Sequence, residues 1–168
     1  PSARGVPPPA ALPQPSDAWV KYHGDHFKKS LAVCQDAGEA PVRLVDARYL
    51  IRLGKSGGVL PRRQDVPPEA FIDLPALVSM RAGGRLRDCL RIICVSHTWL
   101  DQNHCDPHGD NLRVLSAALS AFVEPTSEET YAVFFDFISL HQRGLDGTER
   151  TPREITLFTR ALDRMDLF

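Results

Sequence analysis

Two short apolar runs, separated by one amphipathic segment, constrain the fold more than any other feature of the chain. Leu90 to Ser96 is almost continuously apolar and rich in β-branched residues, and Tyr131 to Phe137 is a second apolar run. Strands of this kind are typical of parallel sheets that are covered on both faces. Between them, Asp110 follows Gly109 as an expected N-cap, and apolar residues recur at helical spacing at Leu112, Leu115, Ala118, Leu119 and Phe122. The pattern predicts two parallel strands joined by a right-handed crossover helix.

A second helix is predicted to follow the second strand. Thr151-Pro152-Arg153-Glu154 places Thr at the N-cap, Pro at the first helical position and Glu at the third, which together form a capping box. The apolar residues expected to face the sheet are Ile155, Phe158, Leu162 and Met165. Two strands and their helices do not bury a complete parallel sheet, and no stop signal precedes Phe168. We therefore expect an α/β fold whose sheet is truncated at the C-terminus of this chain.

The first half of the chain is organised differently. Residues 1–16 are expected to be a disordered, proline-rich leader, because six of the 14 prolines fall among the first fifteen residues. Residues 17–87 are expected to form an irregular helical extension that packs on the unit spanning 88–168. Within this extension, aromatic residues between 17 and 40 favour a short docking helix.

The middle of the extension carries weaker signals. Residues 42–45 favour a short strand that runs into a helix ending at Gly54. The glycines and prolines between 57 and 68 predict a loop. A further short helix is expected over 69–80, interrupted by Pro75.

Composition and charge exclude several classes of function. The net charge of −1 provides no field that would attract nucleic acid or an anionic membrane, and basic residues are scattered among acidic ones. No apolar run is long enough to span a membrane. The four cysteines, Cys34, Cys89, Cys94 and Cys105, form no C-x-x-C pair and are too few for a disulfide scaffold of this length. We therefore expect a reduced, cytoplasmic protein.

Polar side chains stand where the two predicted parallel strands end. In open parallel sheets, ligands bind in the crevice beyond the carboxyl ends of the strands. This rule selects the following candidate ligand-binding residues: Ser96, His97, Trp99, Asp136, Ser139 and Gln142. Five of them also have a structural interpretation. Ser96 and His97 would cap the strand end, Trp99 would pack, Gln142 would bond to its loop, and Asp136 would pair with Arg150 or Arg153.

The chain carries no clear signature of a catalytic or metal site. Imidazole, thiol and carboxyl groups do cluster, at His97, His104, Cys105, Asp106, His108 and Asp110. Their spacing matches no common zinc motif, so we predict no metal. A nucleophilic Cys105 lacks any identifiable oxyanion hole. The glycine motifs that bind phosphates are absent, and we assign no catalytic residue and no required cofactor.

The two strand ends resemble those of the TIR-like superfamily, which includes fungal heterokaryon-incompatibility (HET) domains. Cys94-Val95-Ser96-His97-Thr98-Trp99 is similar to the opening strand of TIR domains. The run from Phe134 to Gln142, followed by Glu154 and Met165, is similar to a HET pattern. The segments 57–64 and 104–109 further resemble those of a group of protist proteins with the same layout. The resemblance covers about half of the chain.

This resemblance implies a flavodoxin-like fold with one of two functions. The first is a signalling module that assembles with itself or with partners, and it is the reading we place first. The alternative is a nucleotide-binding or NAD-cleaving domain, with an NAD-like ligand at the crevice. In enzymatic TIR members a glutamate on a helix after the third strand carries catalysis, and this chain ends before that position. Glu154 matches the HET glutamate instead, so it receives no catalytic role.

Overall fold

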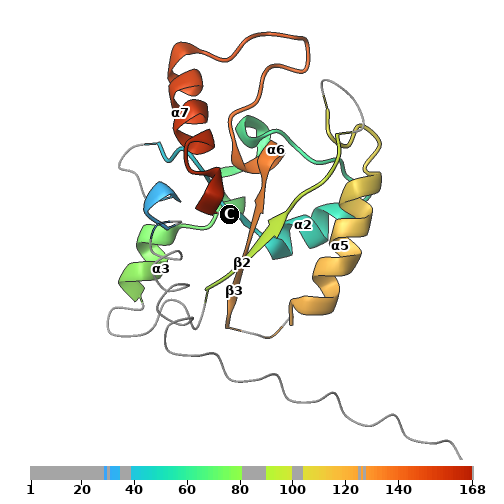
Figure 1. Ribbon diagram of the computed structural model, residues 1–168. Coiled ribbons are helices and arrows are strands. Elements are labelled where there is room, and N and C mark those ends of the chain that lie inside the picture. Colours follow the sequence, from blue (N-terminus) through green and yellow to red (C-terminus); the bar gives the residue numbers. More distant parts are fainter. Residues whose placement is uncertain are drawn as a thin grey trace, which may run out of the picture.

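The computed structural model describes residues 29, 31–34, 39–80, 90–99, 104–124, 126 and 128–167. The proline-rich leader lies outside these residues, as do Trp19, Tyr22 and Phe27. The described part is a mixed α/β structure (Figure 1). In chain order its elements are β1 (Val45–Asp46), α2 (Ala47–Lys55), η1 (Arg63–Asp65), η2 (Pro68–Ala70), α3 (Leu74–Met80), β2 (Leu90–Val95), α5 (Asp110–Phe122), β3 (Thr130–Phe135), α6 (Asp136–Ser139), α7 (Pro152–Leu162) and η3 (Met165–Leu167).

The central prediction, two parallel strands joined by a helix, is confirmed. β2 pairs in parallel with β3, in a register that sets Leu90 opposite Thr130 and Val95 opposite Phe135, and α5 connects the two strands. The expectation of an all-parallel sheet is wrong, because β1 pairs antiparallel with β3. The sheet is therefore mixed, in the order β1-β3-β2. The short strand expected over 42–45, followed by a helix, is confirmed in part, because β1 occupies Val45–Asp46 and runs directly into α2. β1 ends where the Asp46 side chain caps α2 by accepting from the Arg48 N–H.

β3 is the central strand, and its alternating side chains divide the core into two layers. Val133 and Phe135 belong to the cluster that includes residues of α2 and α5, whereas Ala132 and Phe134 belong to the cluster that includes residues of α3 and α7. Figure 1 shows α5 on one side of the two parallel strands and α3 and α7 on the other. All four of these β3 side chains are buried. Leu31 and Cys34 join the second layer, so residues 31–34 pack on the body of the protein.

β2 is less buried than its apolar sequence predicts. It lies at the edge of the three-stranded sheet, with Leu90 buried, Ile92, Ile93 and Val95 half-buried, and Cys94 exposed. A strand of a parallel sheet that is covered on both faces would bury these side chains. The expectation that this strand is covered on both faces is therefore wrong for the part of the chain that the structure describes.

The helix α5 begins as predicted but is capped by a different residue. Asp110 is its first residue, and the N-cap is Gly109, which has a φ of 77°. The side chain of Asp106 performs the capping, because its two carboxyl oxygens accept from the N–H groups of Asn111 (2.9 Å) and Leu112 (3.0 Å). Asp106 is fully buried, so these bonds supply the partners that water would otherwise provide.

The helices α2 and α5 approach closely at a glycine. A Cβ atom added to Gly54 would lie 2.4 Å from the Cβ of Ser116. The Ser116 hydroxyl donates to the carbonyl oxygen of Ile51 across the same contact, at 3.1 Å. Gly54 was expected to end its helix, but α2 continues to Lys55. The lack of a side chain at Gly54 therefore allows α2 and α5 to pack closely.

Three features of the elements differ from the sequence-based expectation. The second long strand stops at Phe135, because residues 136–139 turn into α6. Pro75 lies in the first turn of α3 and does not interrupt it, as expected of a residue whose N–H is not needed there. The buried stripe of α7 contains Leu157 and Ala161, with Phe158 half-buried.

The face predicted for α7 is therefore partly wrong. Ile155 and Leu162 were expected to face the sheet, and both are about half exposed, at 49% and 48%. The capping box that starts α7 is confirmed, with Thr151 accepting from the Glu154 N–H and Glu154 accepting from the Thr151 N–H. Among the described helices, none combines the length and the apolar character needed to cross a membrane.

Candidate functional site

A hollow of about 250 Å³ lies at the carboxyl end of the parallel strand pair. The loop that joins α6 to α7, orange in Figure 1, rises from the end of the sheet toward which β2 and β3 run. This loop supplies most of the walls. The lining residues are Trp99, Phe137, Gln142, Arg143, Gly144, Gly147 and Arg150. A hollow at this edge agrees with the rule that parallel sheets bind ligands beyond their strand ends.

Trp99 and Asp136 meet across the two strand ends. The indole N–H of Trp99 donates to a carboxyl oxygen of Asp136 at 3.3 Å. The ring of Trp99 stands edge-on to Phe137, with 5.5 Å between ring centroids and an angle of 88°. Trp99 is 38% exposed, so part of its ring remains open to a ligand. The expected partners of Asp136, Arg150 or Arg153, are wrong, since Asp136 accepts instead from Trp99 and from the Phe137 N–H.

Gln142 forms the floor of the hollow, and hydrogen bonds hold both its side chain and its backbone. Its side-chain amide donates to the carbonyl oxygens of Asp136 and Leu140, each at 3.0 Å. Its backbone N–H donates to the side chain of Gln64 at 3.2 Å, and its carbonyl oxygen accepts from the same side chain at 2.7 Å. These bonds agree with the structural interpretation of Gln142, although the residue also lines the hollow. They fix the backbone from which the loop departs.

Two arginines bring positive charge to the hollow. The Nε of Arg150 donates to the carbonyl oxygen of His141 at 2.6 Å, and its guanidinium lies over the ring of Phe158 at 3.8 Å. Burial and the nearby charge of Arg143 lower the pKa of Arg150. Arg143 pairs with Glu149 at 3.0 Å and is mostly exposed. An anion in the hollow would relieve the repulsion between the two arginines.

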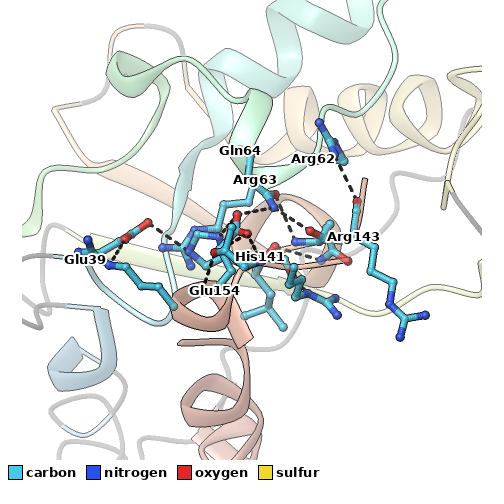
Figure 2. A network of polar contacts seen from close by, with 12 residues as sticks. Glu39, Arg62, Arg63, Gln64, His141, Arg143 and Glu154 are labelled. Atoms are coloured by element: carbon cyan, nitrogen blue, oxygen red, sulfur yellow. Dashed lines mark hydrogen bonds and ion pairs between the residues drawn. The ribbon is translucent and has the colours of Figure 1, made fainter. Parts of the chain in front are cut away.

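A second hollow, of about 530 Å³, lies on the other side of the same loop. Gln142 and Gly144 line both hollows, so the loop separates them. The second one is lined by charges of both signs: Arg62, Asp146, Glu149 and Glu154. Gln64 and Glu154 also line it, and Figure 2 shows both of them, with His141, in one polar network. Its mixed charge gives it less selectivity for anions than the first hollow has.

The structure brings only part of the predicted set of ligand-binding residues to the hollow. Trp99 and Gln142 line the hollow. Asp136 is not among its lining residues, but it accepts a hydrogen bond from Trp99. Ser96 is exposed at the end of β2, whereas Ser139 is fully buried and its hydroxyl accepts from the Phe135 N–H. The ring of His97 packs on Phe135 with 4.3 Å between centroids.

Sequence reasoning missed the two arginines of this site. Arg143 and Arg150 flank a loop with two glycines, one of which, Gly147, has a φ of 85°. Basic residues on both sides of such a loop, directly after the second strand, were the available signal. The partner of Gln142, Gln64, lies 78 residues away in sequence and gives no local signal.

The histidine and cysteine cluster after β2 has structural contacts. The Nδ1 of His104 accepts from the Asp106 N–H at 2.8 Å, and Cys105 is fully buried. Burial, with the charges of Asp136 and Asp106, raises the pKa of Cys105 to about 12, so its thiol is protonated at neutral pH. Within the described ranges, no group of three or more His, Cys, Asp and Glu side chains is arranged to hold a metal ion.

The chain was compared with protein-family models, with curated proteins and with solved structures, and none of them matches. The TIR-like and HET-like resemblance therefore depends on the short motifs at the two strand ends, and its functional implications are proposals.

Proposed function

We propose that the hollow at the carboxyl ends of β2 and β3 binds the phosphate and aromatic ring of a nucleotide-type ligand. The observation that carries this proposal is the convergence of two arginines, Arg143 and Arg150, on a hollow that also contains an exposed tryptophan ring. This combination favours the alternative that the family resemblance offers, a domain with an NAD-like ligand.

The arginines suit a phosphate group. Guanidinium groups donate in a planar fork that matches phosphate oxygens. Arg150 donates through its Nε to the carbonyl oxygen of His141, and its other two guanidinium nitrogens donate no hydrogen bond within the described residues. That bond and the contact with Phe158 fix the side chain, so little additional conformational entropy is lost on binding.

The aromatic side of the hollow suits a base. Trp99 is held by its bond to Asp136 and by its edge-on contact with Phe137, and its ring is partly exposed. A nucleobase or nicotinamide ring would stack on it, a contact that tolerates different rings because each has a π-face.

The test is a titration with NAD, ADP-ribose, AMP and inorganic phosphate, followed by tryptophan fluorescence in a Trp19→Phe background. That background leaves Trp99 as the reporter, because the chain has two tryptophans. We expect quenching by the nucleotides and weaker binding of inorganic phosphate. Arg150→Gln should lower the affinity about tenfold, a change of about 1.4 kcal/mol.

Arg113→Gln is the matched control, because Arg113 is an exposed arginine on α5 that pairs with Asp110 away from the hollow. Equal affinities of the Arg150→Gln and Arg113→Gln proteins would refute the proposal. The absence of both a fluorescence change and a heat of binding at millimolar nucleotide would do the same.

NAD cleavage is the enzymatic form of this proposal. Glu154 remains without a catalytic role in it, because its carboxylate is engaged by the Thr151 N–H and hydroxyl and by Gln64. We expect no release of nicotinamide from the 168-residue chain, because no glutamate is among the described residues that line the hollow.

Self-assembly is the second candidate function, and the edge position of β2 favours it. The edge of β2 offers backbone N–H and C=O groups to a strand of a second copy. On the neighbouring α5, Val114 and Phe122 are 66% and 69% exposed. We expect the sedimentation coefficient to rise with protein concentration, and Phe122→Glu to abolish the rise. Leu145→Glu is the matched control from the loop between α6 and α7, and identical behaviour of both variants would exclude this surface.

A further inference from the structure

A third hollow, of about 640 Å³, lies between the helical segment 31–34 and the C-terminal end of α7. Figure 1 shows this segment, in blue, next to the end of α7, in red. The described residues that line the hollow are basic (Lys29, Arg160, Arg164), acidic (Asp163) or apolar (Ala32, Val33, Pro41), and none of them lines the two hollows at the strand ends. Its volume falls within the range of about 300–1,000 Å³ that is usual for sites of small molecules.

The two walls of this hollow are fixed to one another through the core. Leu31 and Cys34 of the segment and Ala161 of α7 are buried in the same hydrophobic cluster. Pro41 is also buried, and its carbonyl oxygen accepts from the guanidinium of Arg63. The hollow is therefore formed without a ligand, and binding requires little reorganisation of its walls.

Positive charge reaches the hollow from both walls. Arg160 is on α7, and Arg164 follows four residues later, in a turn where its N–H donates to the carbonyl oxygen of Ala161 at 3.0 Å. Lys29 comes from the opposite wall. Asp163 is the one acidic residue among the described lining residues, so three basic side chains face one acidic side chain. The lining is therefore positively charged at neutral pH.

Helix polarity explains only part of this charge. Basic residues near the end of a helix interact favourably with its last carbonyl groups, and this accounts for Arg160 and Arg164. It does not account for Lys29, which lies in another segment. Among the ion pairs between described residues, none involves Lys29 or Arg164. An anion placed between the two walls would reduce the repulsion between these like charges.

The lining suits a ligand that combines an anionic group with an apolar part. Guanidinium and ammonium groups are the usual donors to phosphate oxygens. Ala32, Val33 and the buried Pro41 provide an apolar surface beside them. We propose that this hollow is a binding site for a small phosphorylated molecule with an apolar part. The site is separate from the proposed nucleotide site and does not depend on it.

The test is an NMR titration of the 168-residue chain with phenyl phosphate, inorganic phosphate and benzoate. We expect the backbone amides of Val33, Arg160 and Arg164 to shift together and to saturate with one dissociation constant. Phenyl phosphate should bind more tightly than inorganic phosphate, which lacks the apolar part, and more tightly than benzoate, which lacks the phosphate. The proposal is overturned if these amides do not shift, or if phenyl phosphate binds no more tightly than either of the other probes.

The double variant Lys29→Gln with Arg164→Gln should weaken the binding of phenyl phosphate by about tenfold or more, because charge-assisted hydrogen bonds are stronger than neutral ones. Both side chains are exposed, so the fold should persist. The matched control is Arg52→Gln with Lys55→Gln, which removes two basic residues from the last turn of α2, outside this hollow. Equal weakening by the two double variants would show attraction to the general charge of the protein and would overturn the proposal.

Two single variants complete the test. Asp163→Asn should raise the affinity for phenyl phosphate, because it removes a charge of the same sign as the ligand. Arg150→Gln should leave this affinity unchanged, because Arg150 lines the hollow at the strand ends and not this one. Loss of the amide shifts in the Arg150→Gln protein would place the phosphate in the other hollow and overturn the proposal. The nucleotide proposal is judged separately, by the fluorescence of Trp99.

Discussion

The side-chain amide of Gln64 binds the backbone of Gln142 at both of its polar groups, like one residue of an added strand. The amide nitrogen donates to the carbonyl oxygen at 2.7 Å, and the amide oxygen accepts from the N–H at 3.2 Å. The same nitrogen also donates to Glu154 at 3.1 Å. One side chain of η1 therefore holds both the floor of the hollow and the start of α7.

Replacing Gln64 by Ala should destabilise the fold. Gln142 is 7% exposed, and the change leaves its N–H and C=O without partners, at a cost of ~1–3 kcal/mol. The free energy of unfolding from urea titrations measures this loss. Glu69→Ala is the control, from an exposed site in the neighbouring η2. A Gln64→Ala protein as stable as the Glu69→Ala protein would show that the paired amide contributes nothing.

Replacing either of two aspartates near the start of α5 should lower the stability of the protein by clearly different amounts. Asp106→Ala removes the buried carboxyl group that caps the N–H groups of Asn111 and Leu112, and should cost ~1–2 kcal/mol. Asp110→Ala removes an exposed residue of the first turn that pairs with Arg113, and should cost ~0.5 kcal/mol or less. Circular dichroism during urea unfolding gives both values. The reverse order of stabilities would contradict the capping role of Asp106.

Gly54→Ala should destabilise the protein although alanine is the better helix former. Alanine gains ~1 kcal/mol of helix propensity, but its Cβ would lie 2.4 Å from that of Ser116, and overpacking of this kind costs ~1–3 kcal/mol. The double variant Gly54→Ala with Ser116→Gly removes the overlap. A double-mutant cycle should therefore show favourable coupling between the two changes, and additive effects would argue against a steric origin.

The thiols of the described cysteines should react at different rates. Cys94 is exposed, whereas Cys34 and Cys105 are buried, and burial raises the pKa of each buried thiol to about 12. In a Cys89→Ser background, iodoacetamide should label Cys94 first, which peptide mass spectrometry detects. Although Cys94 is exposed, partial desolvation of its thiol by neighbouring groups raises its pKa above 9.0, so the rate should keep rising with pH through that value. Labelling of Cys105 in the native protein at pH 8 would contradict its placement.

The parts of the fold that the sequence predicted correctly have strong local patterns. The run that became β2 is apolar and rich in β-branched residues, and the run that became β3 is apolar and aromatic. α5 follows a helical period, and Thr151 to Glu154 contains both halves of the capping box. Each of these signals lies within one element, so it does not depend on distant contacts.

The failures concern contacts between distant residues. β1 has two residues, and its pairing with Val133 cannot be found from a pattern of that length. Asp106 caps α5 from outside the helix, where no periodicity marks it. The buried face of α7 contains Leu157 and Ala161 and not the predicted Ile155 and Leu162, because packing against the sheet, and not the helix alone, decides which face is buried.

The candidate site follows the same division. The rule for parallel sheets placed Trp99, Asp136 and Gln142 at the correct end of the strands. It could not place Arg143 and Arg150, because their position depends on the path of the loop after α6. The residues that hold this loop, including Gln64, lie in a part of the chain that shares no motif with it.

The central position of β3 has a consequence for the order in which the protein forms. Among the described strands, β1 and β2 each pair with β3 and not with each other. During synthesis, the first 129 residues contain neither pairing, so the two earlier strands must wait for β3 to leave the ribosome. Sheet formation then brings together residues 88 positions apart, as at Val45 and Val133, a separation that slows folding. Until that moment the apolar run of β2 has no partner among the described strands, and an apolar segment in that state is prone to aggregate.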